Sequence, residues 1–132
     1  YEKPNNKFVA DFIGMSNFLK LNKLATNGSS IQLSFNDIKF SLVNEKEINS
    51  DQISGVLRPE HIIFNTNNND DNIISMEGVV EIISYQGALI RYIINANGTK
   101  FISEISNLPG TKRYKEGEKI NFLFDKNNLV LI

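Results

Sequence analysis

The chain has 132 residues, of which 41% are hydrophobic and 10% aromatic, a content that excludes a disordered polymer and is large enough for a core. Fourteen basic and fifteen acidic residues leave a net charge of −1, which argues against a dedicated binder of nucleic-acid backbone. The chain contains no cysteine, which excludes disulfides, thiolate nucleophiles and cysteine-ligated metals.

Residues 1–14 predict a short helix. Pro4 suits a helix start, and Gly14 can adopt the left-handed conformation that ends a helix. A helix of two to three turns is marginally stable alone in water, so its apolar face is expected to dock either on its own domain or on another one. The apolar side chains that share this face are Phe8, Val9, Phe12 and Ile13.

Between Ile31 and Leu42 polar and apolar residues alternate, which is typical of strands with one buried face. Asn36-Asp37 is a candidate two-residue turn in the middle of this segment. A hairpin around that turn predicts three apolar cross-strand pairs on one face: Phe35 with Ile38, Leu33 with Phe40, and Ile31 with Leu42.

A second hairpin is predicted around Asn97-Gly98, because this dipeptide readily supplies the two positive φ angles of a type I′ turn. Its register places Arg91 opposite Glu104 on one face. The opposite face then carries two apolar pairs: Ile94 with Phe101, and Ile90 with Ile105.

Further strands are predicted at residues bounded by Asn, Asp, Gly or Pro: 18–24, 53–57, 62–64, 78–84, 119–124 and 129–132. Many short strands with almost no helix predict an all-β barrel or sandwich. The Asn- and Asp-rich stretch at 65–72 divides the chain into two β-rich parts that share no clear sequence repeat.

The sequence predicts no catalytic, cofactor or metal site in this chain. His61 is its one histidine, and a lone histidine beside Glu60 is more typical of a surface or capping residue than of a catalytic base. A zinc site would need carboxylates for most of its ligands, and no calcium loop is present. No phosphate-binding loop is present either, so the chain alone is not expected to hydrolyse ATP.

Three segments occur in order along the chain: residues 1–14, the Ser-Asn-Phe-Leu of 16–19 and the Leu-Arg-Pro-Glu of 57–60. Together they resemble the C-terminal part of ATP-binding subunits of ABC importers, which ends in a transport-associated, oligonucleotide-binding-like regulatory domain. Residues 78–87, which end in Tyr-Gln-Gly, and 117–122 are similar to two later strands of that family. The Ser-Asn-Phe-Leu segment resembles the spermidine/putrescine branch more than the maltose or iron branches.

The resemblance implies an oligonucleotide-binding-like barrel or sandwich built from two β-rich parts. Residues 1–14 would be the connecting helix from a nucleotide-binding domain, and residues 15–132 the regulatory β domain. Its expected role is regulation and dimerisation of an importer ATPase, with polyamines as the transported substrate. The parent chain would bind ATP and Mg²⁺ and lie in the cytoplasm, at the inner face of the plasma membrane.

The partners implied are a second copy of the chain, the preceding nucleotide-binding domain and, indirectly, the importer membrane subunits. Candidate contact residues follow from the matched motifs: Phe8, Phe12, Ile13, Arg58, Glu60, Tyr85 and Gly87. Arg58 and Glu60 could present a fixed charge pair at a contact, or form a local pair in a strand-end turn. Tyr85 packs in the core or lies at a contact, and Gly87 could admit another backbone. Met15 and the 65–72 loop depart from the pattern and weaken any inference of direct ligand contacts.

Two other functions remain open at the level of sequence. An independent oligonucleotide-binding protein would use Tyr85, Tyr92 and Phe101 to stack on bases, although the net charge argues against it and no nucleic acid is expected. A small-ligand module would instead hold an oxyanion or a polyamine between the two β-rich parts.

Overall fold

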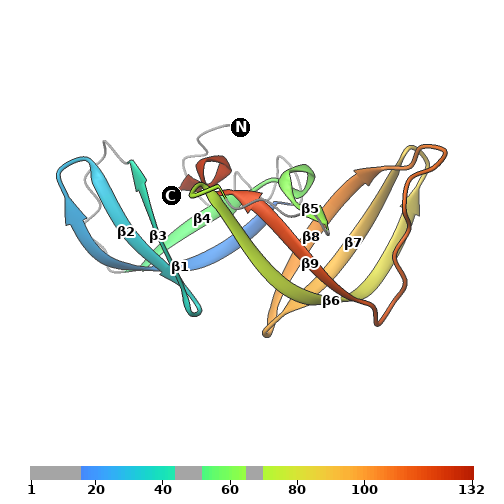
Figure 1. Cartoon of the computed structure of the whole chain (residues 1–132), viewed down its shortest axis with the longest axis horizontal. Coiled ribbons are helices and arrows are strands. Elements are labelled where there is room, and N and C mark those ends of the chain that lie inside the picture. The colour runs from blue at the N-terminus through green and yellow to red at the C-terminus, as the bar shows by residue number, and fades with distance from the viewer. Residues whose placement is uncertain (1–15, 44–51, 65–69) are drawn as a thin grey trace.

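The structure, a computed structural model, describes residues 16–43, 52–64 and 70–132 (Figure 1). The helix predicted at 1–14 lies outside these residues. Within them the fold is all-β, as predicted: ten strands form two antiparallel, curled sheets that lie side by side along the long axis of the molecule.

Each sheet has five strands. The first sheet has the order β10-β4-β1-β2-β3, with bounds β1 Asn17–Asn27, β2 Ser30–Phe35, β3 Ile38–Val43, β4 Gln52–Leu57 and β10 Val130–Leu131. The second has the order β5-β9-β6-β7-β8, with bounds β5 Ile63–Phe64, β6 Ile73–Gln86, β7 Leu89–Ala96, β8 Thr99–Ser106 and β9 Lys119–Asp125. Two short 3₁₀ turns follow β4 and β9: η1 Pro59–His61 and η2 Lys126–Asn128.

The two halves of the chain repeat one topology and exchange their last strands. In each half four strands form a sheet, a 3₁₀ turn follows, and the fifth strand joins the sheet of the other half. The registers are also equivalent: Leu21 of β1 pairs with Ile53 of β4 in the first half, and at the corresponding position of the second half Gly78 of β6 pairs with Ile120 of β9. The sequence carries no clear repeat that would reveal this symmetry.

Both predicted hairpins are confirmed in register. All three apolar pairs around Asn36 form, and Asn36 has a positive φ of 53°. In the second hairpin Asn97 and Gly98 have φ angles of 56° and 89°, as a type I′ turn requires. The predicted pairs are again present: Ile94 with Phe101, Ile90 with Ile105, and Arg91 with Glu104.

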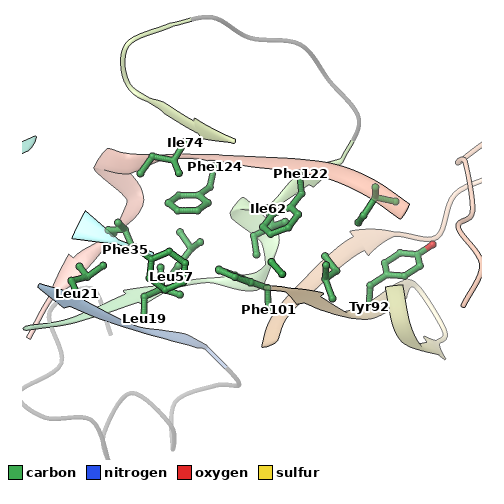
Figure 2. Packing of buried hydrophobic residues seen from close by; sticks show 14 of the residues in the cluster. Leu19, Leu21, Phe35, Leu57, Ile62, Ile74, Tyr92, Phe101, Phe122 and Phe124 are labelled. Atoms are coloured by element: carbon green, nitrogen blue, oxygen red, sulfur yellow. The ribbon is translucent and has the colours of Figure 1, made fainter. Parts of the chain in front are cut away.

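One apolar core runs through both sheets (Figure 2). The ring of Phe35, from β2 of the first sheet, meets that of Phe101, from β8 of the second, edge to face at 5.9 Å between centroids. Phe101 in turn lies 5.1 Å from Phe122 of β9. Because the sheets share this core and exchange strands, the halves are expected to fold together.

The predicted limits were wrong mainly for β1 and β6. Strand β6 begins at Ile73, five residues before the predicted start, and β1 continues to Asn27. Both contain an irregularity in register, between Lys23 and Ala25 and between Val80 and Ile82. In β1 the inserted residue lies at the predicted end and breaks the alternation of period two there, so the pattern-based limit falls short of the real strand end.

Candidate functional site

The Arg58-Pro59-Glu60 motif forms η1, where the chain crosses from β4 of the first sheet to β5 of the second. Pro59 is buried, and Glu60 is exposed. The backbone N–H of His61 donates to the carbonyl of Arg58 at 3.1 Å, and that of Ile62 to the carbonyl of Pro59 at 3.3 Å. The crossing turn therefore fixes the place of the Glu60 carboxylate at the surface, where a partner can reach it.

His61 ends the same turn and is only partly exposed. Its Nδ1 is buried and has no hydrogen-bond partner in the part of the chain that the structure describes. Within residues 16–43, 52–64 and 70–132 there is also no cluster of three histidine or acidic residues that could hold a metal ion. The described geometry gives His61 no partner for acid–base or metal chemistry.

Tyr85 and Gly87 lie at the other end of the second sheet, at and after the end of β6. Tyr85 is 56% exposed, so it is not a core residue, and the Arg113 guanidinium lies 5.6 Å from its ring centroid. Arg113 Nη2 donates to Asn107 Oδ1 at 2.9 Å, and Asn107 Nδ2 donates to the Gly87 carbonyl at 3.2 Å. These contacts place the exposed Tyr85 ring beside the hydrogen-bonded Arg113 at the β6–β7 turn.

No backbone among the described residues approaches Gly87, and the contact with another domain or subunit expected there stays a prediction. A Cβ atom at Gly87 would meet nothing within 4 Å, and the residue is required instead by its φ of +64° in the β6–β7 turn. The close approach occurs at Gly78, which sequence reasoning did not single out. A Cβ there would lie 2.6 Å from Ile94 Cγ2 and 3.0 Å from the Asn95 carbonyl oxygen.

Two of the three residues considered for base stacking are inaccessible. Tyr92 and Phe101 are fully buried, and only Tyr85 is exposed. Tyr92 packs edge to face against Phe64 and Tyr114, and its hydroxyl oxygen accepts the Tyr114 backbone N–H at 3.2 Å. Burial raises the pKa of the Tyr92 hydroxyl above its ordinary value. Of the three candidates, only Tyr85 can therefore present its ring to single-stranded nucleic acid.

Asn17, from the Ser-Asn-Phe-Leu segment, joins the two sheets. It begins β1 of the first sheet, and its side chain is bound to the backbone of Ile102 in β8 of the second. Nδ2 donates to the Ile102 carbonyl at 2.8 Å, and Oδ1 accepts the Ile102 N–H at 2.6 Å. Asn17, to which the resemblance assigns no role, is thus a structural clamp between the two sheets.

Two cavities meet at Glu77 and Asn97, each with a volume of about 420 Å³. One also contacts the β2–β3 turn, so residues distant in sequence line it and no local motif could have revealed it. Polar and apolar groups line the two cavities about equally, and two carboxylates face one cationic group. The polar lining residues are Asn36, Asp37, Glu77, Asn95, Asn97, Lys119 and Asn121.

The predicted contact residues that the structure describes, Arg58, Glu60, Tyr85 and Gly87, lie at two separate places. Figure 1 shows η1 between the two sheets and the β6–β7 turn at the outer end of the second sheet. Phe8, Phe12 and Ile13 lie outside the described residues. Among the described residues no helix is long and apolar enough to cross a bilayer.

Residues 55–132 match the sequence profile of the TOBE domain family. The chain is 29% identical over 126 residues to the spermidine/putrescine import ATP-binding protein PotA of Ruegeria pomeroyi, an alignment covering 94% of this chain and 33% of that protein. It is 25% identical over 137 residues to PotA of Rubrobacter xylanophilus, covering 100% and 35%. The chain thus spans about a third of the length of these relatives.

A solved structure has the same fold. The cytoplasmic molybdate-binding protein ModG, in a crystal form with molybdate bound, superposes with a TM-score of 0.63 over 87% of this chain and 94% of that chain. The sequences are 15% identical, so the likeness concerns the fold alone. It agrees with the oligonucleotide-binding-like architecture that the sequence predicted.

Proposed function

The chain belongs to the TOBE domain family, and from this premise we propose that it is the accessory regulatory and dimerisation domain of an ABC importer ATP-binding subunit. The observation that carries the proposal is the alignment with PotA, which covers nearly all of this chain and a third of that protein. Since the matched relatives are named for spermidine and putrescine import, we propose polyamines as the transported substrate.

In this proposal residues 15–132 are the regulatory domain and residues 1–14 connect it to a nucleotide-binding domain that binds ATP and Mg²⁺. The parent subunit lies in the cytoplasm against the importer membrane subunits. A regulatory domain requires no catalytic group of its own, because it acts by binding one arrangement of the paired ATPase more tightly than the other. Exposed Glu60 and Tyr85 are available for such contacts, at two separate places on the surface.

The proposal can be tested first on the gene and then on the protein that it encodes. The reading frame upstream of Tyr1 is expected to encode a phosphate-binding loop within roughly 200–250 residues, the length of one larger domain. The parent subunit is then expected to hydrolyse ATP, and Glu60→Ala or Tyr85→Ala to change its pairing or its regulation without loss of fold. An upstream frame with no phosphate-binding loop overturns the proposal.

A second candidate function is binding of a small ligand, favoured by the cavities at Glu77. Because the ModG structure has molybdate bound, an oxyanion is one candidate ligand. Glu77 and Asp37 would repel an oxyanion and are opposed by Lys119 alone among the charged groups of the described lining. The lining therefore suits a cationic amine better than an anion.

Thermal-shift titrations of the 132-residue chain distinguish these cases. A ligand present at 100 times its Kd stabilises the native state by about 2.7 kcal/mol, which raises the melting temperature measurably. A rise with spermidine that is abolished by Glu77→Gln supports a polyamine site. A rise in the melting temperature with molybdate or sulfate would support an oxyanion site instead. If no ligand raises the melting temperature at millimolar concentration, dimerisation remains the proposed role.

A further inference from the structure

Three isoleucines form a row across the outer face of the second sheet. Ile82 of β6 pairs with Ile93 of β7, which pairs with Ile102 of β8. The residues that alternate with them on β7 and β8, such as Tyr92 and Phe101, are fully buried, so the three isoleucines point away from the core. Ile82 is 52% exposed, and the other two are partly exposed. This isoleucine row is an apolar strip on a sheet face.

Ion pairs border the isoleucine row on both sides. Arg91 Nη2 lies 2.9 Å from Glu104 Oε2 on one side, two residues from Ile93 and Ile102 along their strands. Lys100 pairs with Glu81 on the other side. A narrow apolar strip between charged borders matches a segment that is itself apolar on one face and polar at its flanks.

The chain preceding β1 emerges beside this row. Because the Asn17 side chain is hydrogen-bonded to the backbone of Ile102, the start of β1 is held at the edge of β8. Phe12 precedes Asn17 by five residues, a span that reaches about 7 Å as helix and about 16 Å when extended. Ile82 lies two strand spacings from Ile102, roughly 10 Å. Phe12 therefore reaches the Ile102 end of the row as helix, and the row as far as Ile82 when the segment is extended.

We propose that the isoleucine row is the docking surface for residues 1–15, with Phe8, Phe12 and Ile13 packed on it. The row then fixes how the preceding part of the chain sits against the second sheet. That consequence rests on the proposed function, whereas the docking itself requires only this chain.

The small size of the row favours a tethered segment over a second copy of the chain. A stable interface between separate proteins buries at least about 1,000 Å², far more than three partly exposed isoleucines provide. A tethered segment is present at an effective concentration in the millimolar range, so a small apolar contact is sufficient.

Cysteine pairs test the contact directly, because the chain has no cysteine of its own. Phe12→Cys combined with Ile82→Cys is expected to form an intramolecular disulfide in most molecules under mild oxidation. The matched control combines Phe12→Cys with Val43→Cys, a position 78% exposed on β3 of the first sheet, and is expected to stay reduced. Equal yields in the two pairs, or disulfide-linked dimers in place of monomers, would overturn the proposal.

A double-mutant cycle in the full chain gives an independent readout. Phe12→Ala and Ile82→Ala together are expected to lower the melting temperature by about 2–6 °C less than the sum of their separate effects, because they remove the same contact. Phe12→Ala with Val43→Ala should be additive. Additivity in both cycles contradicts the docking but leaves the importer proposal untouched, since that proposal depends on the upstream gene.

Discussion

The Asn17 side chain binds Ile102 as a neighbouring strand would. Its carboxamide offers a donor and an acceptor in one plane, like a peptide group, and engages both the carbonyl and the N–H of Ile102. Ile102 lies on β8, an edge strand of the second sheet, while Asn17 begins β1 in the first. The buried Asn17 side chain thus provides hydrogen-bond partners for one residue of an edge strand and holds the two sheets together.

Asn17→Ala is expected to destabilise the chain by about 1–3 kcal/mol, because it leaves a partly buried donor and a partly buried acceptor of Ile102 without the Asn17 partner. Urea denaturation measures this loss. Amide hydrogen exchange at Ile102 should also accelerate, since its N–H loses the Asn17 acceptor.

Asn22→Ala is the matched control, because Asn22 lies on the same strand with its side chain exposed. Its effect should stay within about 0.5 kcal/mol. If the two variants are equally stable, the clamp contributes nothing to folding.

Gly78→Ala is expected to cost about 1–3 kcal/mol through overpacking. The new Cβ would lie 2.6 Å from Cγ2 of the fully buried Ile94 and 3.0 Å from the backbone carbonyl oxygen of Asn95 in β7, and neither can retreat easily. At Gly55 the Cβ would meet Leu21 Cδ1 at 3.0 Å, the mobile end of a side chain. Gly55→Ala should therefore cost clearly less, and chemical denaturation of both variants checks the order.

The local part of this fold was predictable from the sequence. Asn97-Gly98 defines a type I′ turn, and the alternation on either side then determines every pair of that hairpin. The same holds around Asn36, where the register follows from apolar residues that must share one face. In both hairpins, residues that are close in sequence determine the turn and the register of the strands.

The long-range part was not predictable. Strands β5 and β10 have two residues each and pair with β9 and β4 of the opposite half, so no local pattern names their partners. The Ser-Asn-Phe-Leu segment singles out Asn17, but the role of its side chain was not predictable, because its partner Ile102 is 85 residues away. The cavities at Glu77 likewise exist only once distant segments meet.

The buried hydroxyl of Tyr92 predicts a loss of stability at alkaline pH. Burial raises its pKa in the folded state, whereas the unfolded chain releases this proton near pH 10. Above about pH 10 the unfolded state therefore binds fewer protons than the native state. The free energy of unfolding falls as the pH rises, by up to about 1.4 kcal/mol per pH unit for one such group.

Tyr92→Phe should remove this contribution to the alkaline slope. At neutral pH it is expected to cost about 1–2 kcal/mol, because the buried Tyr114 N–H loses its acceptor. Tyr85→Phe is the control: Tyr85 is exposed, and the variant should change neither quantity. Urea denaturation at pH 7 and at several values above pH 10 measures both, and an unchanged slope in Tyr92→Phe rejects the assignment.

Strand exchange predicts that neither half of the chain folds alone. A cut between residues 67 and 68 gives two fragments, and each carries the last strand of the other's sheet. Each fragment also exposes half of the shared core, including one ring of the Phe35–Phe101 contact. Separately they should show little sheet signal by circular dichroism. Mixed in equal amounts they should recover the spectrum and a single thermal transition. Independent folding of either fragment would show that the exchanged strands and shared core are dispensable.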